Sequence, residues 1–281
     1  MTVLARFALR EALRRRVFTV VAWLTVAFLV LYALGVWQAF KISSDFDSGF
    51  QNVDGDTVVG ATMLGLGIFG TLFLGVVLAI FLTLGAIRGD AERGLLQQLL
   101  VRPLTRRDVL LSRLLAAGGV SAAYVAAVYL GAVLITGAIG GWWPGNVLTP
   151  ALALMGAVVL VTALSLTGSV LLAATANGIA VFMAFGAGLV AGLLGQIGHA
   201  FGSNTLESVA DVASFALPFE ALYQAALGEL TSRETGLAGF VLRLGPLGGE
   251  RDSGIGLWLW AVAYLVVIMA LALRAFRRAD L

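Results

Sequence analysis

Six long stretches without a single charged residue dominate this chain of 281 residues. A membrane-spanning helix needs about 20 consecutive apolar residues, and stretches of that order recur along the whole chain. They cover residues 17–40, 58–87, 114–140, 148–175, 178–201 and 256–273. Only helices satisfy all their own backbone hydrogen bonds within single segments of hydrocarbon. The pattern therefore predicts an all-α polytopic membrane protein with six transmembrane helices, organised as one transmembrane domain over residues 1–281.

The composition excludes an ordinary soluble domain. Hydrophobic residues make up 60% of the chain and charged residues 12%, whereas soluble domains carry about twice that charge. Cysteine is absent, so disulfides and thiolate metal sites are excluded. The arginines form no basic face with interleaved aromatic residues, so we expect lipid around the chain and no nucleic-acid partner.

The charged residues divide unequally between the two sides of the predicted bundle. The segments before the first span, between the second and third, and after the sixth hold 14 basic and 5 acidic residues. The remaining connections hold 4 basic and 11 acidic residues. Loops rich in Lys and Arg stay in the cytoplasm. We therefore expect a multi-pass protein of the cell membrane with both termini cytoplasmic.

Two segments beside the spans have helical patterns of their own. Residues 2–16 place apolar side chains at helical spacing among arginines, which predicts an interfacial helix before the first span. Some 54 residues separate the fifth and sixth spans. Within them residues 206–216 and 219–227 are periodic and Pro218 interrupts the pattern. We expect two short helices at the outer membrane face, followed by a glycine-rich loop over 236–256.

The chain carries no recognisable machinery for chemistry. It has no G-x-x-x-x-G-K-[ST] phosphate loop, and its only lysine is Lys41, outside the predicted spans. No Asp, Glu, Lys or Arg lies inside a span, and the single histidine, His199 at the outer end of the fifth span, builds no metal site alone. We therefore predict no catalytic residues, no metal and no cofactor within this chain, and leave any substrate site unassigned. Energy is expected to arrive mechanically through the cytoplasmic face.

Glycines in two spans allow helices to approach closely. In the second span they favour packing within one subunit: Gly60, Gly65, Gly67, Gly70 and Gly75. In the fifth span a small-x-x-x-small series is equally compatible with internal packing and with a dimer seam: Ala184, Gly188 and Gly192.

The most informative segment is the connection between spans two and three, RGDAERGLLQQLLVRPLTRRDVLLSRLL, residues 88–115. Four leucines recur at helical spacing and Pro103 follows them. Such a helix is too short to cross a bilayer, so its leucine face must lie against lipid, the chain's own spans or a partner. An exposed leucine patch of this kind commonly marks a docking surface. A loop that only orients the protein needs arginines and not this leucine spacing.

This segment resembles the pattern E-x-G-[TL]-L-x-x-L-L, then P-[LIV]-[ST]-R, of the ABC type-2 permease family. The matching positions are Glu92, Gly94, Leu95, Leu96, Leu99, Leu100, Pro103, Leu104, Thr105 and Arg106. The resemblance extends to the layout of the chain, with six spans, an interfacial helix before the first span and short helices before the sixth. It also includes a short uncharged link at 175–178, which contains an Asn-Gly turn signal. Arg93 departs from the small residue of many relatives, which leaves contact details open.

The resemblance implies a cytoplasmic coupling helix between spans two and three that seats on a separate ATPase subunit. The residues implicated in this role are Glu92, Gly94, Leu95, Leu96, Leu99, Leu100, Pro103 and Arg106. It further implies two ATPase copies carrying ATP and Mg²⁺, a second permease copy or a close paralogue, and a pathway lined by spans one, two and five. ATP hydrolysis is then not an activity of this chain, and the family favours export over uptake.

Three alternatives remain at this level. One is a related permease of metallocofactor maturation, such as that of nitrous oxide reductase assembly, which has a similar layout. Another is a membrane-embedded enzyme, which the missing catalytic groups disfavour. The third is a passive channel or scaffold, which the leucine-faced segment disfavours.

Overall fold

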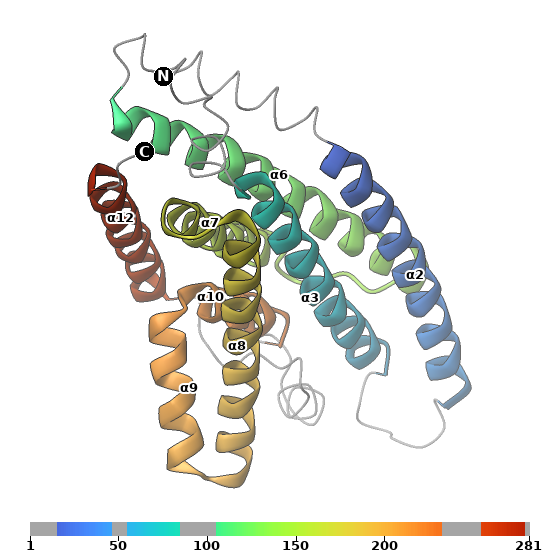
Figure 1. The fold of residues 1–281 in the computed structure, drawn as a ribbon. Helices are drawn as coiled ribbons and strands as arrows, with labels where there is room; N and C mark the ends of the chain where they lie inside the picture. Colours follow the sequence, from blue (N-terminus) through green and yellow to red (C-terminus); the bar gives the residue numbers. More distant parts are fainter. Residues whose placement is uncertain (1–15, 47–54, 85–104, 232–253, 279–281) are drawn as a thin grey trace.

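The structure, a computed structural model, describes residues 16–46, 55–84, 105–231 and 254–278. Within these ranges the regular structure is α-helical, as Figure 1 shows. The helices are α2 (Arg16–Phe46), α3 (Gly55–Thr83), α6 (Arg106–Gly140), α7 (Leu148–Leu171), α8 (Ala174–Phe201), α9 (Asn204–Ala216), α10 (Pro218–Thr231) and α12 (Ile255–Arg278). Six of them, α2, α3, α6, α7, α8 and α12, are long and apolar enough to cross a membrane. The predicted fold class and six spans are confirmed.

The helices extend beyond the apolar stretches that reveal them. Helix α6 begins at Arg106 where the apolar stretch begins at Leu114, and α12 continues to Arg278 where its stretch ends at Leu273. Hydropathy marks the part of a helix that hydrocarbon surrounds, whereas backbone hydrogen bonds continue until a capping residue ends them. The predicted interfacial helix over 2–16 lies outside the described residues, except for Arg16, the first residue of α2.

The link between α7 and α8 is not where the Asn-Gly signal predicted it. The chain turns at Leu172 and Ala173, and residues 175–178 form the first turns of α8. Asn177 is fully buried and donates a hydrogen bond from Nδ2 to the Ser165 carbonyl, 2.9 Å away. This tertiary bond replaces the local one by which Asn favours turns. The expected link at 175–178 is therefore wrong, although the connection is as short as predicted.

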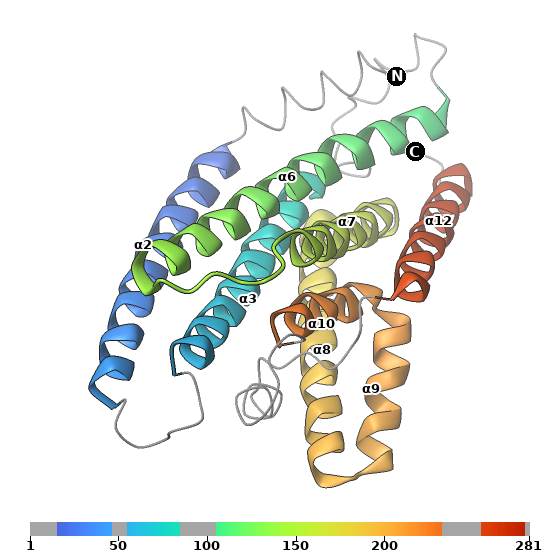
Figure 2. The same cartoon turned by 180° about the vertical axis from the view of Figure 1, so that it is seen from behind.

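Helix α7 lies at the centre of the bundle and contacts α3, α6, α8, α10 and α12. Figures 1 and 2 show these helices around it, with α2 at the edge beside α3 and α6. In the most apolar part of each helix, the share of buried residues is 67% in α3 and 61% in α7. The same share is only 17% in α2 and 11% in α12. Helices α3 and α7 therefore form the core, while α2 and α12 turn most of their apolar surface outward.

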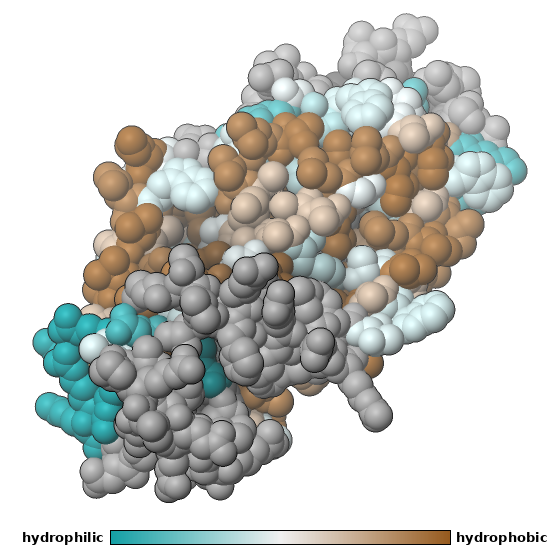
Figure 3. All heavy atoms as spheres, turned by 90° about the horizontal axis from the view of Figure 1, so that it is seen from above, coloured by the Kyte–Doolittle hydropathy of each residue, from teal (hydrophilic) through white to brown (hydrophobic). Residues whose placement is uncertain are grey.

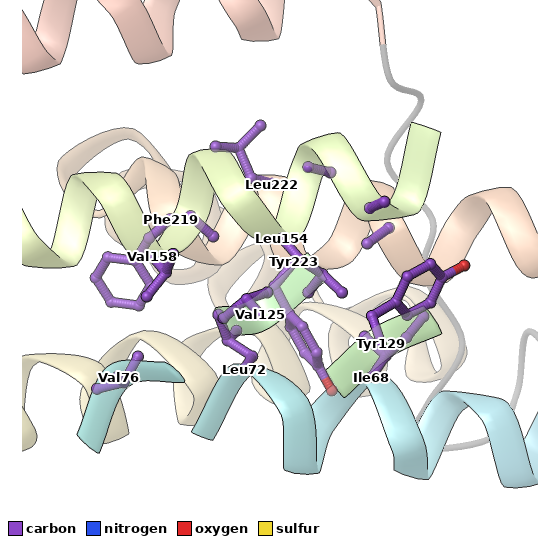
Figure 4. Packing of buried hydrophobic residues seen from close by; sticks show 14 of the residues in the cluster. Ile68, Leu72, Val76, Val125, Tyr129, Leu154, Val158, Phe219, Leu222 and Tyr223 are labelled. Carbon is purple, nitrogen blue, oxygen red and sulfur yellow. The ribbon is translucent and has the colours of Figure 1, made fainter. Parts of the chain in front are cut away.

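The core forms where α3, α6, α7 and α10 meet (Figure 4). Side chains from all four helices are fully buried there, among them Leu72, Tyr129, Leu154 and Leu222. Glycine permits the closest approach, since Gly75 of α3 lies directly under the side chain of Val125 of α6. Small residues let membrane helices gain van der Waals contact that hydrophobicity alone does not supply in lipid.

The short helices expected before the last span are present as α9 and α10. Pro218 is the first residue of α10, where its missing N–H costs nothing. Helix α9 runs back along α8, while α10 packs into the core against α7 (Figure 2). Eight apolar side chains of α10 are buried: Phe219, Ala221, Leu222, Tyr223, Ala225, Ala226, Leu227 and Leu230. The α10 helix is thus a core element and not a surface cover.

Hydroxyl groups and aromatic rings hold α2 on the bundle. The Tyr32 hydroxyl lies 2.6 Å from Thr136 Oγ1 of α6, and Thr25 Oγ1 lies 2.5 Å from the Tyr124 hydroxyl. The Phe28 ring occupies the place of a side chain at Gly70 of α3. Polar contacts of this kind join helices that lipid otherwise separates.

The two ends of the bundle differ in charge. At one end α2, α6 and α8 begin and α3, α7 and α12 finish; we name it the basic end after Arg106, Arg107, Arg113, Arg274, Arg277 and Arg278. The opposite, acidic end holds Asp56, Glu207, Asp211, Glu220 and Glu229 beside Lys41. Figure 3 shows hydrophobic side chains over most of the described surface in that view, with the largest hydrophilic patch at one corner.

A methyl group at Gly75 tests the close α3–α6 contact. In Gly75→Ala the new Cβ collides with Val125 Cγ2, and a β-branched valine in a helix has almost one rotamer and cannot swing aside. Overpacking of this kind lowers the free energy of unfolding by about 1–3 kcal/mol, measurable by titration with SDS. The control is Gly119→Ala, whose Cβ meets no atom within 4 Å. Equal stability of the two variants contradicts the assigned contact.

Candidate functional site

The predicted coupling residues fall mostly outside the described part of the chain. Glu92, Gly94, Leu95, Leu96, Leu99, Leu100 and Pro103 lie within residues 85–104, so their helix stays a prediction. Arg106 is described, as are the two helix ends that flank the segment. Helix α3 finishes at Thr83 and α6 begins at Arg106, both at the basic end. The segment therefore starts and finishes at that end of the bundle.

A capping box fixes the start of α6. Thr105 is the N-cap and accepts a hydrogen bond from the Asp108 backbone N–H, while the Asp108 carboxylate accepts from the Thr105 N–H at 3.3 Å. The Thr105 hydroxyl also donates to Asp108 Oδ2 at 2.7 Å. These bonds satisfy backbone donors that a helix start leaves free. The chain thus enters α6 at a defined residue and direction, immediately after the predicted docking segment.

Arg106 connects the start of α6 to the end of α12. Its guanidinium donates a hydrogen bond to the Phe276 carbonyl and lies over the Phe276 ring, 5.4 Å from the centroid. A cation is unfavourable at the positive end of the α6 dipole but favourable at the negative, carbonyl end of α12. The family resemblance implies a coupling role for Arg106, which stays a prediction; in this structure its side chain binds the chain's own last span.

A second hydrophobic cluster lies beneath this contact. It joins α6, α7 and α12 through Leu110, Leu114, Ala163, Leu166, Val170, Ala272 and Phe276. Leu110 and Leu114 belong to the leucine-rich re-entry of the segment analysed above, so their apolar spacing serves internal packing. The basic end is consequently a packed unit of three helix ends, with an arginine bound across it.

An aromatic row leads from the surface of α3 into the core. Phe69 and Phe73 of α3 are exposed and stacked, with ring centroids 6.4 Å apart. Phe73 then contacts Phe185 of α8 at 6.5 Å, and Phe185 contacts Phe219 of α10 at 5.9 Å. Leu66 and Phe81 extend the exposed apolar face of α3 along the helix. The most buried span therefore still presents one aromatic face to the outside.

Helix α8 has two faces with different roles. On one, a Cβ at Gly188 would lie 2.9 Å from the Phe219 ring, and Gly192 leaves room for the Glu220 carboxylate. Gly188 and Gly192 therefore allow α8 to pack closely against α10. Of the two interpretations of the small-residue series, internal packing and a dimer seam, these contacts support internal packing. The other face, which we name the α8 seam, is apolar, with small residues among larger ones: Ile179, Ala180, Met183, Gly186, Ala187, Val190 and Ile197. All of them are exposed except Gly186, which is half-buried.

A buried carboxylate lies at the acidic end. Glu220, in the first turn of α10, is 1% exposed, and the Ser214 hydroxyl donates to its Oε2 at 2.6 Å. The positive end of the α10 dipole favours a carboxylate at this position. Burial raises the pKa of the Tyr223 phenol, and the neighbouring Glu220 carboxylate raises that pKa further. Glu220 is one of the 11 acidic residues counted in the connections between spans, and the structure buries its side chain.

Two further hydrogen bonds join α10 to its neighbours. Gln196 of α8 donates to Gln224 Oε1 at 3.2 Å, and Asn146 donates to Glu229 Oε2 at 3.1 Å. Among the residues that the structure describes, no three His, Asp or Glu side chains come together as metal ligands. His199 belongs to the last turns of α8. The acidic end is therefore a polar junction of α8, α9 and α10.

The tertiary contacts of Asn177, Glu220 and the aromatic row were not predicted from the sequence. The sequence contains only weak signals for these contacts. Asn177 was read as a turn residue, and Glu220 follows Pro218, which marks a helix start. Phe69 and Phe73 are one helical turn apart, a spacing that any apolar span also provides by chance. Only the neighbouring helices decide which of these side chains matter.

The comparisons with known proteins agree with this architecture. No curated protein matches the sequence significantly. The model of the ABC-2 family transporter proteins matches residues 3–281, which is nearly the whole chain. Its extent covers all six apolar helices, the segment between α3 and α6, and the α9–α10 pair. The chain therefore belongs to the ABC-2 transporter family and is a multi-pass membrane protein of that family.

Proposed function

We propose that this chain is the permease subunit of an ATP-driven transporter whose ATPase is a separate polypeptide. The observation that carries the proposal is the family match over residues 3–281 together with six apolar helices. The sequence has no phosphate loop, so ATP, Mg²⁺ and their hydrolysis belong to the partner. Members of this family work with such an ATPase and as dimers, so the assembly contains two permease chains and two ATPase subunits.

The ATPase docks on residues 88–104. Supporting this, α3 and α6 frame the segment at the basic end, and the Thr105–Asp108 capping box anchors its exit. The docked subunit pushes against a tightly packed part of the bundle. This part consists of Arg106, the hydrophobic cluster below it and the end of α12. A displacement of the segment therefore reaches α3, α6 and α12 together.

Charge substitution on the leucine face tests the docking role. Leu96→Asp or Leu99→Asp leaves the protein in the membrane but abolishes its copurification with the ATPase or its stimulation of ATP turnover, because a buried carboxylate is desolvated at the interface. Gln97→Asp is the matched control, since it adds the same charge to the same segment off the leucine face. Normal copurification and stimulation with both leucine variants contradict the assignment.

The basic end faces the cytoplasm. The described arginines at this end and the acids at the other follow the asymmetry that sets orientation in membranes. The predicted docking segment then lies where ATP is available. A firm test is possible because the chain has no cysteine of its own, so that an introduced thiol is unique.

Thiol labelling measures the orientation directly. With a membrane-impermeant maleimide in intact cells, Gly254→Cys at the acidic end is expected to react, whereas Arg278→Cys reacts only after permeabilisation. Both positions are exposed, so burial does not explain a difference between them. Labelling of Arg278→Cys in intact cells reverses the proposed topology.

The second permease chain packs along the α8 seam. The seam carries small residues, Ala180, Gly186 and Ala187, between exposed Met183 and Val190, and a Cβ at Gly186 would meet no atom within 4 Å. Small residues on an outward face allow two helices to approach in lipid. The pathway then lies between the two copies, where the aromatic face of α3 lines it with α8. Aromatic and aliphatic walls suit export of a hydrophobic or amphipathic substrate.

Cross-linking tests the seam. Oxidation of membranes carrying Ala187→Cys is expected to give a disulfide-linked dimer, because the two seams face each other. Val266→Cys on α12 is the control, since it is exposed and apolar but lies on another face. A dimer that forms through position 266 and not through 187 places the second copy elsewhere.

A further inference from the structure

A buried amide joins three helices at the basic end. Asn177, in the first turn of α8, is 0% exposed, and its Nδ2 donates to the Ser165 carbonyl of α7 at 2.9 Å. The same nitrogen lies 3.5 Å from Ser165 Oγ. An amide inside a membrane protein needs such partners because no water replaces them.

Ser165 extends the connection to α3. The Thr83 hydroxyl, on the last residue of α3, donates to Ser165 Oγ at 2.6 Å. Thr83 is 1% exposed and Ser165 is 0% exposed, so the pair is closed to solvent. The end of α3, the last part of α7 and the start of α8 therefore share one continuous set of polar contacts.

The local packing is built around this amide. Gly168 of α7 faces Asn177, and a Cβ there would overlap Asn177 Oδ1. Next to the amide, a Cβ at Gly178 would lie 3.1 Å from Leu84 Cδ1 and 3.7 Å from Ile80 Cγ2. Helix α8 thus touches the end of α3 directly as well as through Ser165. Close-packed interiors shift as units, because they deform little between discrete arrangements.

We propose that Asn177 is a positioning residue that fixes the start of α8 to the end of α3 through Ser165. A displacement of α3 at Thr83 then moves α8 with it. The inference rests on the proposed function for its driving force, since the docking segment directly follows α3. Its consequence is that the ATPase acts on the α8 seam, and so on the contact between the two permease copies, without touching α8.

The link itself is measurable on the permease chain alone. Spin labels at Phe81→Cys and Ile179→Cys report the distance between α3 and α8 near the basic end, and labels at Leu66→Cys and Val190→Cys report it toward the acidic end. All four positions are exposed, and the natural chain offers no competing thiol. Each phosphatidylcholine–phosphatidylglycerol nanodisc holds a single labelled chain, so that the α8 seam, which carries positions 179 and 190, is uncovered and each pair reports on one copy.

Asn177→Leu keeps the number and branching of the side-chain heavy atoms and removes the hydrogen bonds. The distance distribution of the basic-end pair is expected to become roughly twice as wide, because packing alone then holds these helix ends. The acidic-end pair keeps its distribution. Gly168→Ala is expected to reproduce the effect by displacing the amide, whereas Gly119→Ala on α6, whose Cβ meets no atom within 4 Å, does not.

An unchanged basic-end distribution in Asn177→Leu overturns the proposal. Equal broadening of both pairs also overturns it, because that result means a general loosening of the bundle. These measurements involve neither ATPase nor nucleotide, so their failure leaves the docking hypothesis standing. Conversely, normal ATPase coupling of the Leu96→Asp and Leu99→Asp variants refutes the docking hypothesis and leaves the measured link between α3 and α8 intact.

Discussion

Hydrocarbon gives a backbone no partner outside its own helix, and this constraint organises the whole chain. It imposes long helices, but it provides no hydrophobic force between them, because lipid is as apolar as the side chains. Close packing must hold the bundle instead. The contacts of Gly75 with Val125, and of Gly70 with the Phe28 ring, show how glycine supplies the necessary space. The glycines of α3 thus provide the space that the large side chains of neighbouring helices fill.

The sequence was sufficient to predict the features that depend on whether lipid or water surrounds a segment. The six apolar stretches became six helices because hydropathy and length alone decide whether a segment enters a membrane. Pro218 correctly separated α9 from α10, since a proline without an N–H favours the first turn of a helix. Charged termini such as Arg106–Arg113 were missed as helix because they lie beyond the hydrocarbon, where apolarity gives no signal.

The features that the sequence did not reveal depend on neighbours distant in sequence. Asn177 followed by Gly178 is a turn signal only while the amide bonds its own backbone, and here Ser165 takes that bond. Glu220 belongs to the core because Ser214 and the space above Gly192 receive it. Likewise, Arg106 contacts Phe276, 170 residues away. No period or local motif encodes these pairs, so the site was predictable only as a segment and not as a set of contacts.

The polar contacts between helices are distributed unevenly, and this bears on how the bundle moves. At the basic end Thr83, Ser165 and Asn177 tie α3, α7 and α8. At the acidic end Gln196 ties α8 to Gln224 of α10, and Ser214 and Glu220 tie α9 to α10. Between these two ends α8 packs against its neighbours through glycines and aromatic rings. Such contacts can slide past one another, whereas moving hydrogen-bonded groups apart breaks their bonds. Helix α8 therefore has a polar anchor at each end and a middle without one. In the proposed mechanism, a push at the basic end moves the start of α8 while the Gln196–Gln224 bond holds its other end, so that the seam tilts toward or away from the second permease chain.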